Sequence, residues 1–314
     1  MVDRETIIKI IEYGTWAPSS HNSQPWKFSI MEDSIEILPE YARRLVVGDK
    51  RNRQLFISLG CAGENIRQGA GALGYEATVT ILDEKIIVRL ERNMGKGNPE
   101  IIQAIKNRVT SRYPYAFDDS LNKIAGYMKG LAEENIDFFI CSGKMKQDIA
   151  GVAVKASVDA MTDGGFRKEL SEYVKSNTTK SKIGMPAHGM GIPTVISYIV
   201  PVLIQYINVN RLNQKSDTKL LVEQTPHLVV IATEQDDSHA WIKTGFLYER
   251  AALAAQRTGL STAMWAAPIE TGDYFMDLQR ILKTNKRPQA LFRLGKALKK
   301  PPHSPRLSAY SFFT

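Results

Sequence analysis

The chain has few cysteines and histidines, and neither type is spaced as a metal site requires. The 314 residues include two cysteines, Cys61 and Cys141, both in apolar surroundings, which predicts buried free thiols and argues against a disulfide framework. The five histidines are scattered without the short spacings typical of metal ligands, so we expect no metal. The first residues also lack the charged and apolar regions of a signal peptide. We therefore expect a cytoplasmic protein.

Acidic residues are fewer than basic ones, 33 against 41, which gives a net charge of +8. Such a balance favours anionic partners: nucleic acid, a membrane surface or a phosphorylated small molecule. The basic residues are dispersed except near the C-terminus and accompany no nucleic-acid-binding module, so we expect no nucleic-acid partner. The apolar content of 43% is that of a folded protein. The length allows one large domain or two of about 150 residues.

Long hydrophobic runs are also scarce, and only residues 192–209 approach the length of a membrane span. Pro193 and Pro201 interrupt this run together with several polar residues, and a stretch rich in glycine and proline precedes it. A transmembrane helix therefore fits poorly. We favour a buried insertion or a lid over residues 184–209, and expect no membrane partner.

The order of apolar and polar residues predicts a mixed α+β fold, because strands, hairpins and helices follow one another without the regular alternation of a parallel sheet. Two hairpins are expected to turn at residues 32–33 and 83–84, with a helix at 53–73 between them. The second part predicts helices at 120–134, 144–161 and 166–175 and strands at 137–141, 227–233 and 290–296.

An internal repeat links two glycine-containing helical segments. Four residues of the first segment recur 185 positions later with the same identity, and these pairs are Gly60 and Gly245, Glu64 and Glu249, Ala70 and Ala255, and Gly74 and Gly259. The pattern predicts two copies of one unit whose long helices pack face to face, as in a fused dimer. With a polar linker at residues 93–98, the predicted halves are 1–95 and 99–314.

The most distinctive stretch is a polar loop, Ala-Pro-Ser-Ser-His-Asn-Ser-Gln-Pro-Trp, at residues 17–26. Its prolines exclude a helix or a central strand, and its side chains offer many hydrogen-bonding groups. The polar residues alone fit an ordinary turn equally well. The ring of Trp26 is well placed to wall a planar ligand, which favours a ligand loop.

Two further motifs carry groups suited to binding an anion or a cofactor. Arg108, Thr110 and Arg112 follow a predicted helix, where guanidinium and hydroxyl groups can converge on a phosphate, although an exposed basic turn is the commoner case. The segment 267–272, Ala-Pro-Ile-Glu-Thr-Gly, follows a predicted strand and also fits a turn that leads into a helix.

Together these motifs resemble the nitroreductase superfamily of FMN-dependent flavoproteins. The resemblance implies that the isoalloxazine lies between the loop at 17–26 and the turn at 268–270, and that arginines hold the phosphate. Thr271 replaces the family's usual glycine. The implied cofactor contacts are Pro18, Ser19, Ser20, Asn22, Gln24, Arg108, Thr110, Arg112, Pro268, Ile269, Glu270, Thr271 and Arg306, with Glu270 as the implied catalytic group.

The N-terminal half keeps only the polar loop, and the other motifs lie in the C-terminal half, which resembles the fused, single-chain Acg-like branch. That branch implies a monomer with one FMN under a lid. It also implies hydride transfer from NAD(P)H through the flavin to a nitro compound, a quinone or another small acceptor. The alternative is a non-catalytic FMN-binding or storage protein whose lid blocks the flavin.

Overall fold

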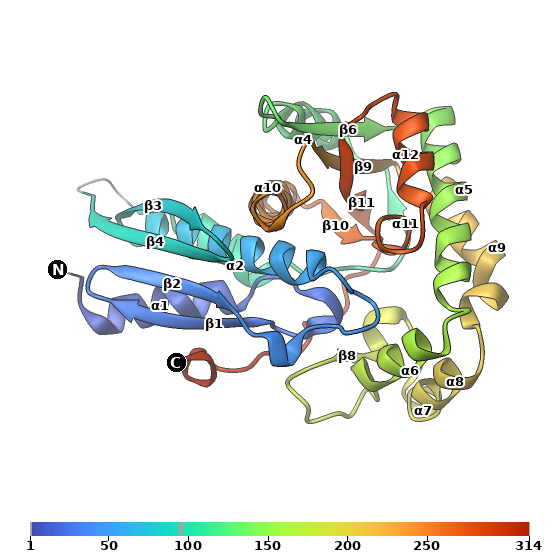
Figure 1. Ribbon diagram of the computed structural model, residues 1–314, viewed down its shortest axis with the longest axis horizontal. Coiled ribbons are helices and arrows are strands. Elements are labelled where there is room, and N and C mark those ends of the chain that lie inside the picture. The colour runs from blue at the N-terminus through green and yellow to red at the C-terminus, as the bar shows by residue number, and fades with distance from the viewer. Residues whose placement is uncertain (1, 94–96, 314) are drawn as a thin grey trace.

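A computed structural model describes residues 2–93 and 97–313 and shows two antiparallel sheets on either side of a central pair of helices (Figure 1). Further helices flank the second sheet, and a small helical segment lies beside them. The predicted α+β organisation is confirmed. Both predicted thiols are free and buried.

The first sheet consists of two hairpins in the order β1-β2-β4-β3. The turns fall at residues 32–33 and 83–84 as predicted, and Glu32 and Asp83 have left-handed φ values of 50° and 53° there. The strands are β1 (Trp26–Met31), β2 (Ser34–Pro39), β3 (Tyr75–Leu82) and β4 (Lys85–Arg92).

The second sheet has the order β10-β11-β9-β6, and a short strand, β5, pairs with the end of β11. Its central strand β9 is buried along most of its length, which explains the continuous apolar sequence there. The three strands predicted in this region are confirmed. The bounds are β5 (Tyr115–Ala116), β6 (Ile136–Cys141), β9 (His227–Thr233), β10 (Ser261–Met264) and β11 (Arg287–Ala297).

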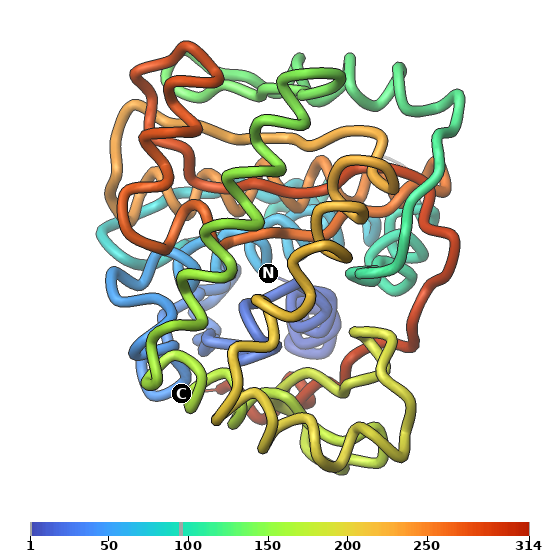
Figure 2. Tube along the Cα trace, turned by 90° about the vertical axis from the view of Figure 1, so that its right-hand side faces the viewer, coloured from blue at the N-terminus to red at the C-terminus, as the bar shows by residue number. Residues whose placement is uncertain are grey.

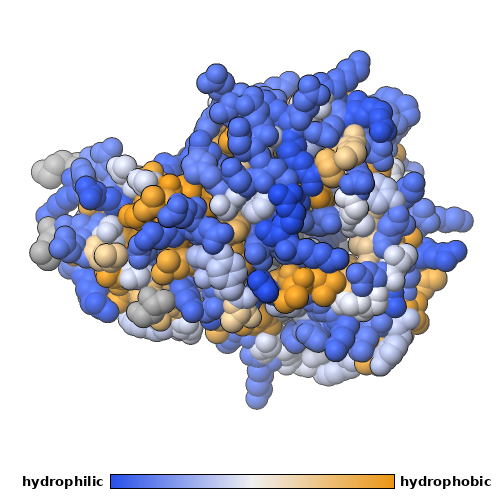
Figure 3. Space-filling view, in the orientation of Figure 1, coloured by the Kyte–Doolittle hydropathy of each residue, from blue (hydrophilic) through white to orange (hydrophobic). Residues whose placement is uncertain are grey.

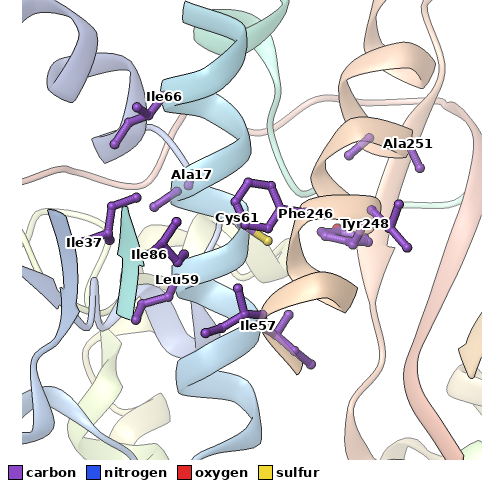
Figure 4. Packing of buried hydrophobic residues seen from close by; sticks show 14 of the residues in the cluster. Ala17, Ile37, Ile57, Leu59, Cys61, Ile66, Ile86, Phe246, Tyr248 and Ala251 are labelled. Carbon is purple, nitrogen blue, oxygen red and sulfur yellow. The ribbon is translucent and has the colours of Figure 1, made fainter. Parts of the chain in front are cut away.

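The central helices α2 (Arg53–Ala72) and α10 (Ser238–Arg257) pack face to face, as the repeat predicts (Figure 4). Their first residues, their last residues and the glycines that follow them, Gly74 and Gly259, all keep the same separation of 185 positions. The fold therefore extends the sequence repeat to whole helices.

These helices approach most tightly at Gly60 and Gly245. A Cβ added to Gly60 would lie 2.0 Å from the Ile242 carbonyl oxygen, and one added to Gly245 would lie 2.1 Å from the Ile57 carbonyl oxygen. These two contacts are equivalent under the repeat. Only glycine permits such backbone contact, which accounts for its presence inside both helices.

The remaining helices cover the sheets and the ends of the central pair. Asp3 caps the first of them by accepting a hydrogen bond from the Thr6 amide. The predicted helix at 120–134 is wrong in its end, because the chain turns at Gly130. The bounds are α1 (Arg4–Thr15), α3 (Pro99–Asn107), α4 (Ser120–Lys129), α5 (Gly143–Ala160), α9 (Val209–Val222), α11 (Ala267–Glu270) and α12 (Tyr274–Leu282).

Residues 164–209 fold around a small separate core that includes Met185, Val200 and Ile204. We call this segment the lid. In the view from the side it lies at the bottom of the molecule beside the C-terminal tail (Figure 2). It contains α6 (Gly164–Tyr173), β7 (Val174–Lys175), β8 (Met185–Pro186), α7 (Thr194–Ser197) and α8 (Val200–Tyr206).

The apolar run at 192–209 is divided between these short helices. Pro193 precedes α7, and Pro201 lies in the first turn of α8, so the run is not one helix. Across the described residues, no helix has the length and apolar character needed to cross a bilayer. The proposed boundary between the halves involves residues 94–96, which lie outside the described part of the chain, and the two-half division stays a prediction.

Candidate functional site

A cavity of about 1120 Å³ lies where the N-terminus of α2, the turn at α11, the helices α5 and α9, and the lid meet. Small-molecule sites commonly occupy roughly 300–1,000 Å³. This cavity is therefore large enough for a sizeable cofactor together with part of a second ligand. On one face of the molecule, strongly hydrophilic side chains gather near a hollow at the centre (Figure 3).

One hydrogen-bond network joins the polar loop to the α11 turn at the cavity wall. Ser20 Oγ donates to Gln54 Oε1 over 3.1 Å, and Gln54 Nε2 donates to Glu270 Oε1 over 2.8 Å. The other oxygen of Glu270 pairs with Arg53 over 3.1 Å. Ser20 and Glu270, predicted from motifs 250 residues apart, are thus connected through the first turn of α2.

Asp236 balances the cations behind this network. It pairs with Arg51 over 2.5 Å, with Arg53 over 3.3 Å and with Arg287 over 3.6 Å. Burial alone would raise the pKa of Asp236, but the Trp241 indole N–H, Arg53 and its other partners bring that pKa down to about 2. The carboxylate therefore remains charged and fixes the guanidinium groups beside the cavity.

Arg112 also lines the cavity. Protein surrounds this side chain, yet it keeps an exposed surface because that surface faces the cavity. Its hydrogen-bond partner is the Met185 sulfur at 3.5 Å, and in the described part of the chain no carboxylate pairs with it. A guanidinium that lacks an anion in such a place fits a phosphate or another anionic group.

His21 also lines the cavity, and the charge of Arg112 acts on it. Burial first and the Arg112 charge second lower its pKa to about 4, so the imidazole is neutral near pH 7. It therefore adds a hydrogen-bonding ring to the wall without adding charge.

The far wall, formed by α5, α9 and the end of β10, has acidic and aromatic groups. Burial raises the pKa of Asp217 to about 6. The Trp265 indole donates to Ser157 Oγ over 2.9 Å, which fixes its ring at the cavity wall. The cavity lining thus combines several arginines with a carboxyl group, Asp217, and the aromatic ring of Trp265.

The polar loop has strained backbone. His21, Asn22 and Gln24 all adopt left-handed φ values, 51°, 56° and 52°, which are uncommon for residues other than glycine. Such clusters persist where surrounding structure imposes them, and they often mark functional loops. Here the imposing contacts come from two distant segments.

Asn22 and Gln24 make those contacts and face away from the cavity. Asn22 Nδ2 donates to the Gly184 carbonyl over 3.0 Å and to the Pro305 carbonyl over 2.9 Å. Gln24 Nε2 donates to the Lys182 carbonyl over 2.7 Å. The two amides clamp the loop to the lid and the C-terminal tail, and in this structure they do not line the cavity.

Arg108 and Arg306 likewise have internal partners. Arg108 pairs with the fully buried Glu249 over 3.1 Å and donates to the Trp16 carbonyl. Arg306 donates to Asn22 Oδ1 and the Ala17 carbonyl, and burial lowers its pKa to about 9. Some nitrogens of both guanidinium groups still lack a hydrogen-bond partner. Of the three arginines predicted to share a phosphate, only Arg112 lines the cavity.

The remaining predicted residues divide between the cavity wall and its support. Ile269, Glu270 and Thr271 line the cavity. Thr271 has φ −98°, so this position needs no glycine, and the left-handed residue is Gly272 with φ 46°. Besides Asn22, Gln24, Arg108 and Arg306, the predicted residues that do not line it are Pro18, Ser19, Thr110 and Pro268.

The prediction that Trp26 walls a ligand is wrong. Its ring is fully buried in the core against Phe312, because the strand that follows the loop turns it inward. Trp265 provides the ring at the cavity wall instead.

Several cavity residues were missed from sequence, among them Arg53, Gln54, Trp265 and Arg287. Arg53 and Gln54 directly follow the N-cap of α2. Their position at the start of a helix was the one feature of the sequence that could have indicated them. Arg287 and Trp265 lie at strand ends whose neighbours are distant in sequence, so no local pattern indicated them.

Residues 1–82 match the family model described as the nitroreductase family. "Putative NAD(P)H nitroreductase Rv3131" of Mycobacterium tuberculosis is 25% identical over 93% of this chain and 86% of its own length. "Putative NAD(P)H nitroreductase acg" of the same organism is 20% identical over 98% of this chain and 94% of its own.

Among solved structures, the FMN- and NADPH-dependent nitroreductase NfnB from Sphigopyxis sp. strain HMH is 13% identical, with a TM-score of 0.42. It covers 67% of this chain and 96% of its own. The FMN-dependent nitroreductase NfnB from Mycobacterium smegmatis, solved with NADPH, is 14% identical over 64% and 88% of the chains, with a TM-score of 0.40.

Proposed function

We propose that this chain, whose residues 1–82 match the nitroreductase family model, binds one FMN in the cavity and acts as an NAD(P)H-dependent flavin oxidoreductase. The observation that carries the proposal is the cavity itself. Its lining includes Ser20 and the turn at 269–271, which belong to the motifs that resemble the family. It also includes the guanidinium group of Arg112, which has no anionic partner in the described part of the chain. The names of the two full-length relatives support the same chemistry.

The residues present fit such a cofactor. Arg112 would hold an anionic part of it, and the turn at 269–271 and Ser20 would face the planar ring from two sides. Arg108 and Arg306 do not line the cavity, but each has guanidinium nitrogens without a hydrogen-bond partner. Because these nitrogens could still donate to a phosphate, the predicted phosphate contact stays part of the proposal. When bound, FMN supplies the hydride chemistry, and the protein supplies orientation and electrostatics.

The chain's own task is to position groups and to limit access. The Ser20–Gln54–Glu270 network fixes the wall, because each side chain in it has a hydrogen-bond partner on another element. Glu270 pairs with Arg53, and this contact fixes its side chain at the turn. We assign it a positioning role, and no nucleophile is required.

The lid limits entry from the other side. Glu169 of α6 accepts hydrogen bonds from the Val47 and Gly48 amides over 2.9 and 2.7 Å, which fastens the lid to the loop before α2. Phe166 and Met190 of the lid line the cavity. Hydride transfer requires reacting atoms within about 3–3.5 Å, so a nucleotide must enter past these residues. This contact is also what favours the second candidate, a storage protein with a blocked flavin.

The acceptor is proposed to be a small molecule such as a nitro compound or a quinone. We further propose a monomer in the cytoplasm, since the two long helices already pack as a dimer of halves would. No nucleic-acid partner is part of the proposal.

Flavin content tests the proposal directly. Protein reconstituted with FMN and freed of excess ligand should show flavin absorbance near roughly 370 and 450 nm. Acid release should give one FMN per chain. Two per chain would refute the single composite site, and none after reconstitution would refute the cofactor assignment.

A further inference from the structure

The outer side of the lid and the start of α9 expose apolar side chains that the proposed function does not use. Six large side chains there are more than half exposed, and we call them the lid face: Val195, Tyr198, Ile199, Val202, Tyr206 and Leu212. Single exposed apolar residues are ordinary, but a group of this size within eighteen successive residues indicates an interaction site. Although the sequence led us to expect no membrane partner, we propose that the lid face docks on an anionic membrane surface.

The position of the lid face suits a peripheral contact. Figure 1 places α7 and α8 at the outer edge of the molecule, away from both sheets. Ser197, Val200 and Ile204 on the same short helices are buried toward the lid core. The segment is therefore amphipathic, with one side packed and the other presented to the surroundings. Amphipathic segments of this kind lie in the plane of the bilayer interface, which requires no spanning helix.

The charge pattern selects the partner. Residues 183–210 contain no Asp, Glu, Lys or Arg, so the lid face enters an apolar environment without burying a charge. Exposed cations stand at both ends of this run, Lys180 and Lys182 before it and Arg211 and Lys215 after it. The first carboxylate after the run, Asp217, lines the cavity, and the nearest one before the run, Glu172, lies on α6.

Each component matches a bilayer interface. Lys and Arg beside an apolar patch are attracted to anionic lipid headgroups. The rings of Tyr198 and Tyr206, 57% and 72% exposed, are of the type enriched at the headgroup level. The net charge of +8 on the whole chain adds a long-range attraction to an anionic membrane.

A second copy of the chain is the weaker occupant. Pairing two lid faces about a twofold axis would bring both sets of flanking cations together, which is a like-charge arrangement. An anionic bilayer neutralises the same cations. The proposal does not depend on flavin or on turnover, so the full chain can be tested without cofactor.

Co-sedimentation with lipid vesicles tests the proposal. At low salt, the protein should bind vesicles of phosphatidylcholine with phosphatidylglycerol and bind phosphatidylcholine alone at least fivefold more weakly. The variant V202S/Y206S should lose at least tenfold in affinity, and K180Q/K182Q/R211Q should lose several-fold. The matched control M31S/L82S changes exposed residues on the hairpins of the first sheet and should bind as the wild type does.

Several results would overturn the proposal. They are no binding of the wild type to the anionic vesicles, equal binding to both vesicle types, or an equal loss in the hairpin control. Analytical ultracentrifugation adds a fourth. A dimer that V202S/Y206S dissociates, without vesicle binding, would assign the lid face to a second copy of the chain.

Discussion

At the scale of single residues, Arg112 is the side chain whose surroundings depart most from those of a structural arginine. Arg53, Arg108 and Arg293 are buried with carboxylate or carbonyl partners, whereas Arg112 faces the cavity with a sulfur contact. An arginine in this position can bind an anionic group of a ligand in the cavity. Replacing it should therefore change the affinity for the ligand and leave the free energy of unfolding largely unchanged.

We expect R112Q to weaken FMN binding by about 1.5–3 kcal/mol, the scale of one hydrogen bond to a charged group. Equilibrium dialysis measures the effect. R280Q is a matched control, because Arg280 is exposed on α12 and pairs within its own helix. If R112Q and R280Q bind FMN equally well, the anionic part of the cofactor lies elsewhere.

Asp49 is a second residue whose pKa departs from its ordinary value. It is buried near Glu270, just before the start of α2. Burial and then the Glu270 charge raise its pKa to about 7, although the Leu55 amide donates to it. The folded state therefore holds a proton that the unfolded chain releases near its ordinary pKa of 3.8. Stability from this group is present at low pH and is lost as pH rises from about 4 through 7.

The variant D49N should remove this dependence while it keeps an acceptor for the Leu55 amide. Urea unfolding of the wild type should give a free energy that falls between pH 5 and pH 8, by at most about 1.4 kcal/mol per pH unit from this residue. The D49N curve should be flatter over the same range. Parallel curves would mean that Asp49 is ionised in the folded protein at pH 5.

At the scale of elements, the contact between α2 and α10 holds the two sides of the molecule together. The hydrophobic residues around it come from both helices and from the first sheet, as Figure 4 shows for Ile37, Ile86 and Phe246. Because the backbones of the two helices are in contact at Gly60, there is no room for a side chain at this position. A single methyl group tests this.

We expect G60A to destabilise the fold by about 1–3 kcal/mol or more, since its Cβ would lie 2.0 Å from the Ile242 oxygen. G71A on the same helix is the control. A Cβ there meets no atom within 4 Å, so the higher helix propensity of alanine should stabilise by up to about 1 kcal/mol. Denaturant unfolding distinguishes the two, and a neutral G60A would contradict the backbone contact between the helices.

The sequence predicted elements better than it predicted the site. Alternating apolar residues and polar turns located both hairpins, and the glycine repeat located the central helices, because these signals are local or recur at one separation. The site depends on which side chains meet. Trp26 turned into the core because its strand alternates, and Asn22 and Gln24 found partners in the lid and the tail.

At the scale of the whole molecule, one cavity gathers the polar loop of the first part, the α11 turn of the second part and the lid. Together they assemble a site that neither part contains alone. The proposed function requires this site to pass hydride from a nicotinamide nucleotide to bound flavin. The alternative is a storage protein. Glu169 fastens the lid to the Val47 and Gly48 amides, and a lid held closed in this way would keep nucleotides from the flavin.

Anaerobic mixing of the FMN-loaded protein with excess NADPH or NADH tests this claim most directly. The absorbance near roughly 450 nm should bleach with at least one of the two nucleotides, and then recover when a quinone or a nitro compound is added. Flavin that dithionite reduces but that neither nucleotide bleaches, in the wild type or in an E169A variant with a loosened lid, would contradict the claim.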